Sequence, residues 1–385
     1  MKAHGWSLSI CCLSLCAGAA TLALTLPQAA TAAVTRPASA AAYPAVPDRL
    51  YSVAAISAND VWAVGLYPTG WLALNWNGST WAQYEASPGY FNGVGASSAS
   101  DVWAVGGTNW FSPSQTLAMH WNGKTLTRVP TPNPPGGGEF SDVAATSPDN
   151  AWAVGLAGPG PGIPSPTTPL IEHWNGNAWT IQKYQVPAAG GQFTGVAAIS
   201  PDNVWVVGYT GAASEGTGQQ TLIEHWNGDT WTRVPSPNVA GASANLLQSL
   251  TVVSADNAWA VGQAVVGGLP KTLALYWNGV QWTISPSLTP GGNAAFLGVT
   301  HSWTNNIWAV GITNPSGCAP SCQTLVEHWN SIHQRWSVIP SPNAPNSGLN
   351  VLWGISAVSR SDIWAVGSTD YASTLIEHWN GTSWS

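Results

Sequence analysis

The stretch TLIEHWNGDTW, from Thr221 to Trp231, returns almost unchanged as TLIEHWNGTSW, from Thr374 to Trp384. Its centre, HWN or a close variant, occurs seven times at intervals of 45 to 53 residues, at Trp76, Trp121, Trp174, Trp226, Trp277, Trp329 and Trp379. A second string, DVWAVG or a variant, precedes each copy, at Trp62, Trp103, Trp152, Trp205, Trp259, Trp308 and Trp364. Repetition with a period of roughly 20 to 50 residues indicates a solenoid, a propeller or an array.

One repeat unit reads as four short strands. Its strands are FTGVAAIS (193–200), VWVVGYT (204–210), TLIEHW (221–226) and WTRVPSP (231–237). Each is rich in β-branched or aromatic residues and bounded by turn residues, and Asn227-Gly228 suits a tight hairpin that makes Trp226 and Trp231 a cross-strand pair. Four antiparallel strands repeated seven times predict an all-β fold, a seven-bladed β-propeller.

The DxWAVG and HWNGxxW units resemble those of exported bacterial β-propeller proteins, which are grouped loosely with the kelch and galactose-oxidase-like propellers. The resemblance covers about Tyr43 to Ser385 and implies an architecture. The chain lacks the paired glycines of kelch repeats, the Gly-His and Trp-Asp signatures of WD40 repeats, and the SxDxGxTW box of sialidases. The resemblance therefore implies no particular activity.

The first residues have the composition of a secretory signal peptide. Lys2 precedes an apolar run from Leu8 to Leu26, and the small-residue string AATAA predicts cleavage after Ala32. An uncleaved membrane anchor is the alternative, because an apolar stretch of about 18 residues is near the lower limit for spanning a bilayer. We therefore predict a signal peptide over 1–32, a linker over 33–42, a propeller over 43–385, and a secreted or cell-surface protein with no membrane span after cleavage.

Two cysteines remain outside the predicted signal peptide, Cys318 and Cys322 in the string GCAPSC. An oxidising compartment allows a disulfide between them. A zinc site would need two more ligands nearby, so we expect a disulfide that pins this loop.

Charge limits the possible partners. Only 7% of the residues are charged and the net charge is -7, with no basic cluster anywhere. Nucleic acid is therefore not an expected partner.

The Glu-His pair of the repeat is expected to be structural. In propellers the third strand of a blade lies away from the axis, and the histidine column contains replacements: Asn75, His120, His173, His225, Tyr276, His328 and His378. The preceding column holds Leu74, Met119, Glu172, Glu224, Leu275, Glu327 and Glu377, and a ring of metal ligands would not include Leu or Met. We expect each histidine to hydrogen-bond a turn of its own or a neighbouring blade, with no metal and no cofactor.

Catalysis would have to come from acids outside the repeat. These are Asp48, Glu85, Glu139, Asp142, Glu215 and Asp370. They are scattered over different loops, and no GxSxG, HExxH or glycine-rich phosphate loop is present. We expect the protein not to be an enzyme, and hydrolase or lyase activity ranks third among the functions considered.

Loop lengths indicate the binding face. The connections between second and third strands and between blades are long and variable, and all of them emerge on one side of a propeller. Several aromatic and amide residues outside the repeat columns lie near that side, and they are the candidate binding residues: Tyr51, Trp71, Trp110, Trp353, Asn92 and Gln248.

Two functions of different classes fit this pattern. The first is a noncatalytic exported scaffold that binds a protein or cell-surface partner through the long-loop face. The alternative is a glycan-binding, lectin-like propeller, since aromatic rings with nearby amides suit hydroxylated ligands. A glycan array separates the two, and we expect a monomer in either case.

Ring closure is the last expectation. The final copy reads GTSWS, so its fourth strand is short, and YPAVP (Tyr43–Pro47) aligns with WTRVP (Trp231–Pro235). We predict that Tyr43–Pro47 runs beside the TLIEHW strand of blade seven and covers its edge. The alternative is a linker after the signal peptide.

Overall fold

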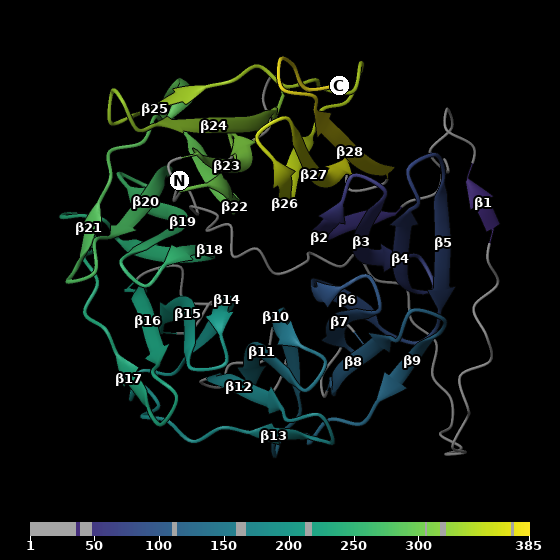
Figure 1. Ribbon diagram of the computed structural model, residues 1–385. Coiled ribbons are helices and arrows are strands. Elements are labelled where there is room, and N and C mark those ends of the chain that lie inside the picture. Colours follow the sequence, from purple (N-terminus) through teal and green to yellow (C-terminus); the bar gives the residue numbers. More distant parts are fainter. Residues whose placement is uncertain are drawn as a thin grey trace, which may run out of the picture.

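The chain folds into a ring of seven β-sheets, as Figure 1 shows. The structure is a computed structural model that describes residues 36–38, 48–109, 114–158, 167–211, 218–304, 306–315, 321–370 and 373–385. Each sheet is one blade with antiparallel strands in sequence order. The predicted seven-bladed β-propeller is confirmed.

Within each blade the strands run in order from the centre of the ring to its rim. The innermost strands are β2 (Arg49–Ser57), β6 (Tyr90–Ser98), β10 (Gly138–Ser147), β14 (Gly191–Ser200), β18 (Ala244–Ser254), β22 (Ala294–Trp303) and β26 (Asn350–Ser359). The second strands are β3 (Asp60–Tyr67), β7 (Asp101–Gly107), β11 (Asn150–Ala157), β15 (Asn203–Thr210), β19 (Asn257–Val266), β23 (Asn306–Thr313) and β27 (Asp362–Thr369).

The outer strands are shorter. The third strands are β4 (Gly70–Trp76), β8 (Thr116–Trp121), β12 (Thr168–Trp174), β16 (Gln220–Trp226), β20 (Leu269–Trp277), β24 (Thr324–Asn330) and β28 (Ser373–Trp379). The fourth strands are β5 (Trp81–Ala86), β9 (Leu126–Val129), β13 (Trp179–Ile181), β17 (Trp231–Arg233), β21 (Trp282–Ile284) and β25 (Arg335–Val338). A 3₁₀ turn at Pro290–Gly292 precedes β22. Among the described residues no helix is long and apolar enough to cross a membrane.

The second strands form the buried layer of every blade. Both faces of a WAVG strand contact neighbouring blades, so its residues are apolar in succession rather than alternately polar and apolar. Trp62 and Trp205 are 2% exposed and Trp364 is 8% exposed. These tryptophans are therefore nearly inaccessible to solvent, as the continuous apolar run of the WAVG segments predicts for a buried strand.

Tryptophans also join each blade to the next. The ring of Trp205 in blade four lies 5.0 Å from Trp277 and 5.5 Å from Trp282 in blade five. Blade seven meets blade one in the same way, with Trp364 5.8 Å from Trp76 and 5.7 Å from Trp81. The ring is therefore closed by the contact that the repeat provides at the other blade interfaces.

The innermost strands pack backbone to backbone around the axis. Each has two bulged residues, one near its start and one near its end, and the residue after the first bulge faces the next blade. At Gly354 a Cβ atom would lie 3.0 Å from the Cα atom of Ser52, so a larger residue there would require the backbone of blade one to shift. Where the residue has a side chain, its oxygen accepts a backbone N–H of the neighbouring blade, as in the contacts of Ser52 with Val94, Asp142 with Val196 and Ser249 with Val299.

The two ends of the described chain lie at different blades. In blade seven, Trp384 forms a bridge with Trp379 on the outer side of β28. Strand β1 (Arg36–Ala38) pairs with β5 of blade one, so three residues of the predicted linker extend that sheet. Tyr43–Pro47, for which we predicted pairing with blade seven, lies outside the described residues.

Candidate functional site

The connections between strands divide the ring into two faces. Turns from first to second strands and from third to fourth strands are short, and they define the short-turn face. Connections from second to third strands and from blade to blade emerge on the other side, which is the long-loop face. The innermost strands begin at the long-loop face, so residues near their starts lie there, close to the axis (Figure 1).

Four of the predicted binding residues occupy one position in the repeat. Tyr51, Asn92, Gln248 and Trp353 are the residues at the first bulge of their innermost strands, and we call them the axial patch. All four are half-buried. A bulge adds a residue to one strand and re-aims its side chain, which explains why this column varies freely between blades.

Two aromatic residues of the axial patch meet where the ring closes. The rings of Tyr51 and Trp353 are 5.9 Å apart and nearly perpendicular, at 80°. This edge-to-face arrangement is a favoured geometry for aromatic pairs. Residues from the first and last blades thus form one amphipathic contact surface.

Asn92 of the axial patch is held in place by a hydrogen bond between blades. The Asn92 side-chain amide donates to the backbone carbonyl of Phe140, at 2.8 Å, which ties blade two to blade three. The hydroxyl of Thr194, at the same repeat position, donates to Leu247 of blade five at 2.8 Å. Asn92 therefore has a structural bond in addition to its position on the surface.

The expectation of an exposed Trp71 is wrong. Trp71 lies on β4, is 6% exposed and packs against Phe91, with ring centroids 5.1 Å apart. The pairing of β4 with β3 turns this side chain inward between blades one and two. Trp110 lies outside the described residues, so its predicted role stays a prediction.

Two acidic residues close to the axial patch are also engaged. The Tyr90 hydroxyl donates to Glu139, and burial raises the pKa of Glu139 despite this bond. Asp142 accepts the backbone N–H groups of Val143 at 2.9 Å and Val196 at 3.0 Å. Burial raises the pKa of Asp142 to about 7, although these two bonds lower it. Both carboxyl groups contribute to contacts between or within blades.

The histidines of the repeat are held by their own blades, as we predicted. The Nε2 atom of His225 lies 3.0 Å from Asn203 Oδ1, at the start of the second strand. His120, His173, His328 and His378 make the equivalent contact with Asp101, Asn150, Asn306 and Asp362. Three repeat aspartates, Asp60, Asp101 and Asp362, stand at this position. Asp149 and Asp256 stand one residue earlier, in the turn, where they accept hydrogen bonds from Ser147 and Ser254.

The described part of the chain contains no group of three or more His, Cys, Asp or Glu side chains that could hold a metal ion. Cys322 is buried beside β23, and its Sγ atom lies 3.3 Å from the carbonyl oxygen of Asn314. Cys318 lies outside the described residues. The predicted disulfide between the two stays a prediction.

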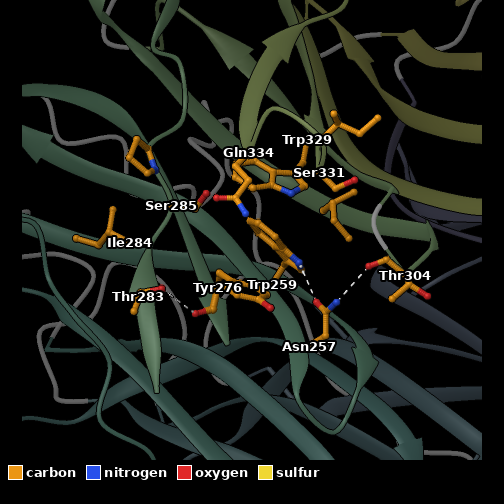
Figure 2. A pocket seen from close by; sticks show the side chains of 13 residues that line it. Asn257, Trp259, Tyr276, Thr283, Ile284, Ser285, Thr304, Trp329, Ser331 and Gln334 are labelled. Atoms are coloured by element: carbon orange, nitrogen blue, oxygen red, sulfur yellow. Dashed lines mark hydrogen bonds between the residues drawn. The ribbon is translucent and has the colours of Figure 1, made fainter. Parts of the chain in front are cut away.

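A cavity lies on the short-turn face, between blades five and six, and Figure 2 shows it from close by. Its volume is about 540 Å³. Blade five contributes residues from β19, β20, β21 and the segment just after β21, and blade six contributes residues from β23, β24 and its two short turns. The lining residues are Asn257, Trp259, Tyr276, Thr283, Ile284, Ser285, Pro286, Thr304, Ile307, Trp329, Ser331, Ile332 and Gln334.

This cavity was not predicted from the sequence, although two features of the sequence mark it. Tyr276 stands in the histidine column, and the turn between Trp329 and Trp336 is two residues longer than its counterpart between Trp277 and Trp282. Each signal changes one blade only. Their combined effect depends on the contact between two blades, which single-repeat reasoning does not describe.

No protein-family model matches the chain, and no curated protein is similar to it in sequence. Solved structures do share its fold. YCF48 bound to D1 peptide is 14% identical, with 91% of this chain and 95% of that chain covered and a TM-score of 0.54. The WD40 repeats of RRP9 are 9% identical, with coverages of 88% and 91% and a TM-score of 0.54. Puromycin hydrolase is 11% identical, with coverages of 91% and 56% and a TM-score of 0.56.

At these identities the similar structures show the fold alone, which is a β-propeller. They include both a WD40-repeat structure, that of RRP9, and YCF48. The grouping with kelch and galactose-oxidase-like propellers stays a prediction.

Proposed function

We propose that the protein is a noncatalytic exported scaffold that binds a protein partner through the axial patch on the long-loop face. The observation that carries this proposal is the Tyr51–Trp353 pair, which is half-buried at the seam between the first and last blades. Aromatic residues are enriched in protein interfaces because they offer a large apolar area with little conformational entropy to lose. Asn92 and Gln248 extend the same surface with amide groups.

A related fold supports a peptide-like ligand. The YCF48 structure is that of a propeller bound to a peptide. A propeller of this size can therefore bind a peptide, and the axial patch offers aromatic anchors with polar neighbours. The acids near the patch are occupied by Tyr90 and by backbone N–H groups, which favours binding over catalysis.

Site-specific photo-crosslinking tests the proposal. A benzophenone amino acid replaces Gln248 in the axial patch and, in a control protein, Trp303, which is 63% exposed near the short-turn face. We expect a discrete covalent adduct with a protein of the cell surface or medium from position 248 and none from position 303. Combining the probe at 248 with Tyr51→Ser and Trp353→Ser should remove the adduct, and combining it with Trp303→Ser should retain it. Equal adducts from both faces would contradict the proposal.

The export part of the proposal depends on residues 1–32, which lie outside the described residues. N-terminal sequencing of protein recovered from the medium is expected to begin at Ala33. Recovery of the chain only in the membrane fraction with Met1 intact would instead indicate a retained anchor.

A further inference from the structure

The cavity between blades five and six exists because the repeat is broken on both sides of it. At the position of Tyr276, the five histidines and Asn75 all bond to the start of their second strand. Tyr276 keeps only the ring contact that the histidines also make, and its ring is tilted against Trp259 with centroids 4.8 Å apart. Opposite it, the longer turn Asn330–Arg335 holds Gln334 in a left-handed conformation, with φ of 46°.

These changes redirect the polar groups around the cavity. In five blades the indole N–H of the HWN tryptophan donates to a carbonyl in the turn of its own blade, as from Trp277 to Ala255 at 3.1 Å. In blade six the corresponding carbonyl, that of Thr304, accepts the side-chain amide of Asn257 at 3.1 Å (Figure 2). Asn257 Oδ1 also accepts a hydrogen bond from the indole N–H of Trp259 at 3.1 Å. Both ends of the Asn257 amide are therefore bonded, which fixes its orientation.

Three polar groups at the cavity have no such bond. Within the described part of the chain, the indole N–H of Trp329, the hydroxyl of Tyr276 and the amide of Gln334 make no hydrogen bond to another protein group. Figure 2 places these three side chains around the same space, with Trp259 between them. They supply one pure donor, the indole N–H, and two groups that both donate and accept, the hydroxyl and the amide.

The chemistry of the lining selects the ligand class. None of the thirteen lining residues is charged, so the cavity offers no counterion to a phosphate, carboxylate or amine. Aromatic faces combined with hydroxyl and amide groups suit a ring that has apolar C–H faces and hydroxyl edges. We propose that the cavity between blades five and six binds a neutral saccharide, independently of the protein partner proposed for the opposite face.

Methyl NMR on the full chain tests this proposal. The probes are neutral trisaccharides of glucose, mannose, galactose and N-acetylglucosamine, with trigalacturonic acid and a neutral tripeptide for comparison. We expect at least one neutral trisaccharide to shift the methyl signals of Ile284 and Ile332, which line the cavity, and to leave Ile199 of blade four unshifted. We expect a Kd of about 1 mM, because the cavity makes few contacts with the ligand.

Two variants and a matched control localise the binding. Tyr276→Phe removes only the hydroxyl and keeps the ring on Trp259, and Gln334→Ala removes the amide. Each should raise the Kd by about threefold to tenfold, as expected for the loss of one neutral hydrogen bond. Gln281→Ala, in the shorter turn of blade five, should leave the Kd unchanged. The proposal is overturned if no neutral trisaccharide binds at about ten times that concentration, if both variants bind like the wild type, or if the acidic saccharide or the tripeptide binds more tightly.

Discussion

Blades three and four carry the same LIEHW motif on their third strands, yet its glutamate has different surroundings. Glu172 in blade three is fully buried, and within the described residues neither carboxyl oxygen has a hydrogen-bond partner. Glu224 in blade four is 1% exposed, but Arg233 places its Nε and NH2 atoms 2.9 Å from Oε1. The difference arises on the fourth strand, where Ile181 opposes Glu172 and Arg233 opposes Glu224.

The two carboxyl groups therefore differ in their preferred charge. Burial raises the pKa of Glu172 to about 9, so this group is protonated at neutral pH. Burial also raises the pKa of Glu224, but the hydrogen bond and the charge of Arg233 lower it. The comparison teaches that one repeated motif can carry different chemistry, because the neighbouring strand determines whether a buried charge is compensated.

The largest expected effect concerns what the two blades share. Trp152 and Trp205 are both 2% exposed, and each packs on two tryptophans of the next blade. Replacing either with Ala should lower the free energy of unfolding by about 3 to 5 kcal/mol, because the large cavity left behind cannot collapse. Urea denaturation measures this, with Trp303→Ala as an exposed control expected to change stability by less than about 0.5 kcal/mol. Costs for the two blades that differ by several-fold would show that their packing also differs.

The next effect tests the role of Arg233. Arg233→Ile reproduces in blade four the surroundings of Glu172 and leaves a buried carboxyl without its partner. At pH 8 we expect a loss of about 1 to 3 kcal/mol in the free energy of unfolding, because the uncompensated group must be desolvated or protonated. Solvent screening keeps this loss small, because the Arg233 side chain is 42% exposed. The reciprocal change Ile181→Arg should stabilise blade three at pH 8, and destabilisation there would break the comparison.

The smallest effect for a single step of one pH unit is a pH dependence. The folded-state pKa of Glu172, about 9, is raised from an ordinary value of 4.5, so the unfolded chain releases this proton at lower pH than the folded chain. The contribution of Glu172 to stability is thus complete below pH 4.5 and is lost as the pH rises towards 9. The slope in that window is about 1.4 kcal/mol per pH unit. In denaturation series from pH 5 to pH 8, Glu172→Gln should reduce the slope of the free energy of unfolding against pH by the contribution of one proton.

Glu224→Gln is the matched control for that series. Because Arg233 lowers the pKa of Glu224, its replacement should change the slope less than the replacement of Glu172. Equal changes from both variants would mean that the fourth-strand residue does not control the ionisation.

Much of the fold could be predicted from the sequence, and the reasons are local. Asn227-Gly228 and its copies require tight turns, so the sequence predicts the strand boundaries. Trp226 and Trp231, on either side of one such turn, lie opposite each other as expected. The candidate site was predicted less well. The column of Tyr51 and Trp353 was located correctly, but Trp71 was taken for a surface residue. Its column position did not reveal that it turns towards Phe91 in the next blade.

By itself, the sequence determined the number of blades, the order of strands and the burial of the WAVG tryptophans, because repetition, strand periodicity and turn chemistry act within a single unit. Only the tertiary structure decided which partner each buried glutamate meets and where a cavity opens. The Glu172 and Glu224 surroundings depend on cross-strand register, and the space beside Tyr276 depends on the longer turn that follows Trp329 in the adjacent blade. Contacts between residues about fifty positions apart are set by the closure of the ring, and no single repeat encodes them.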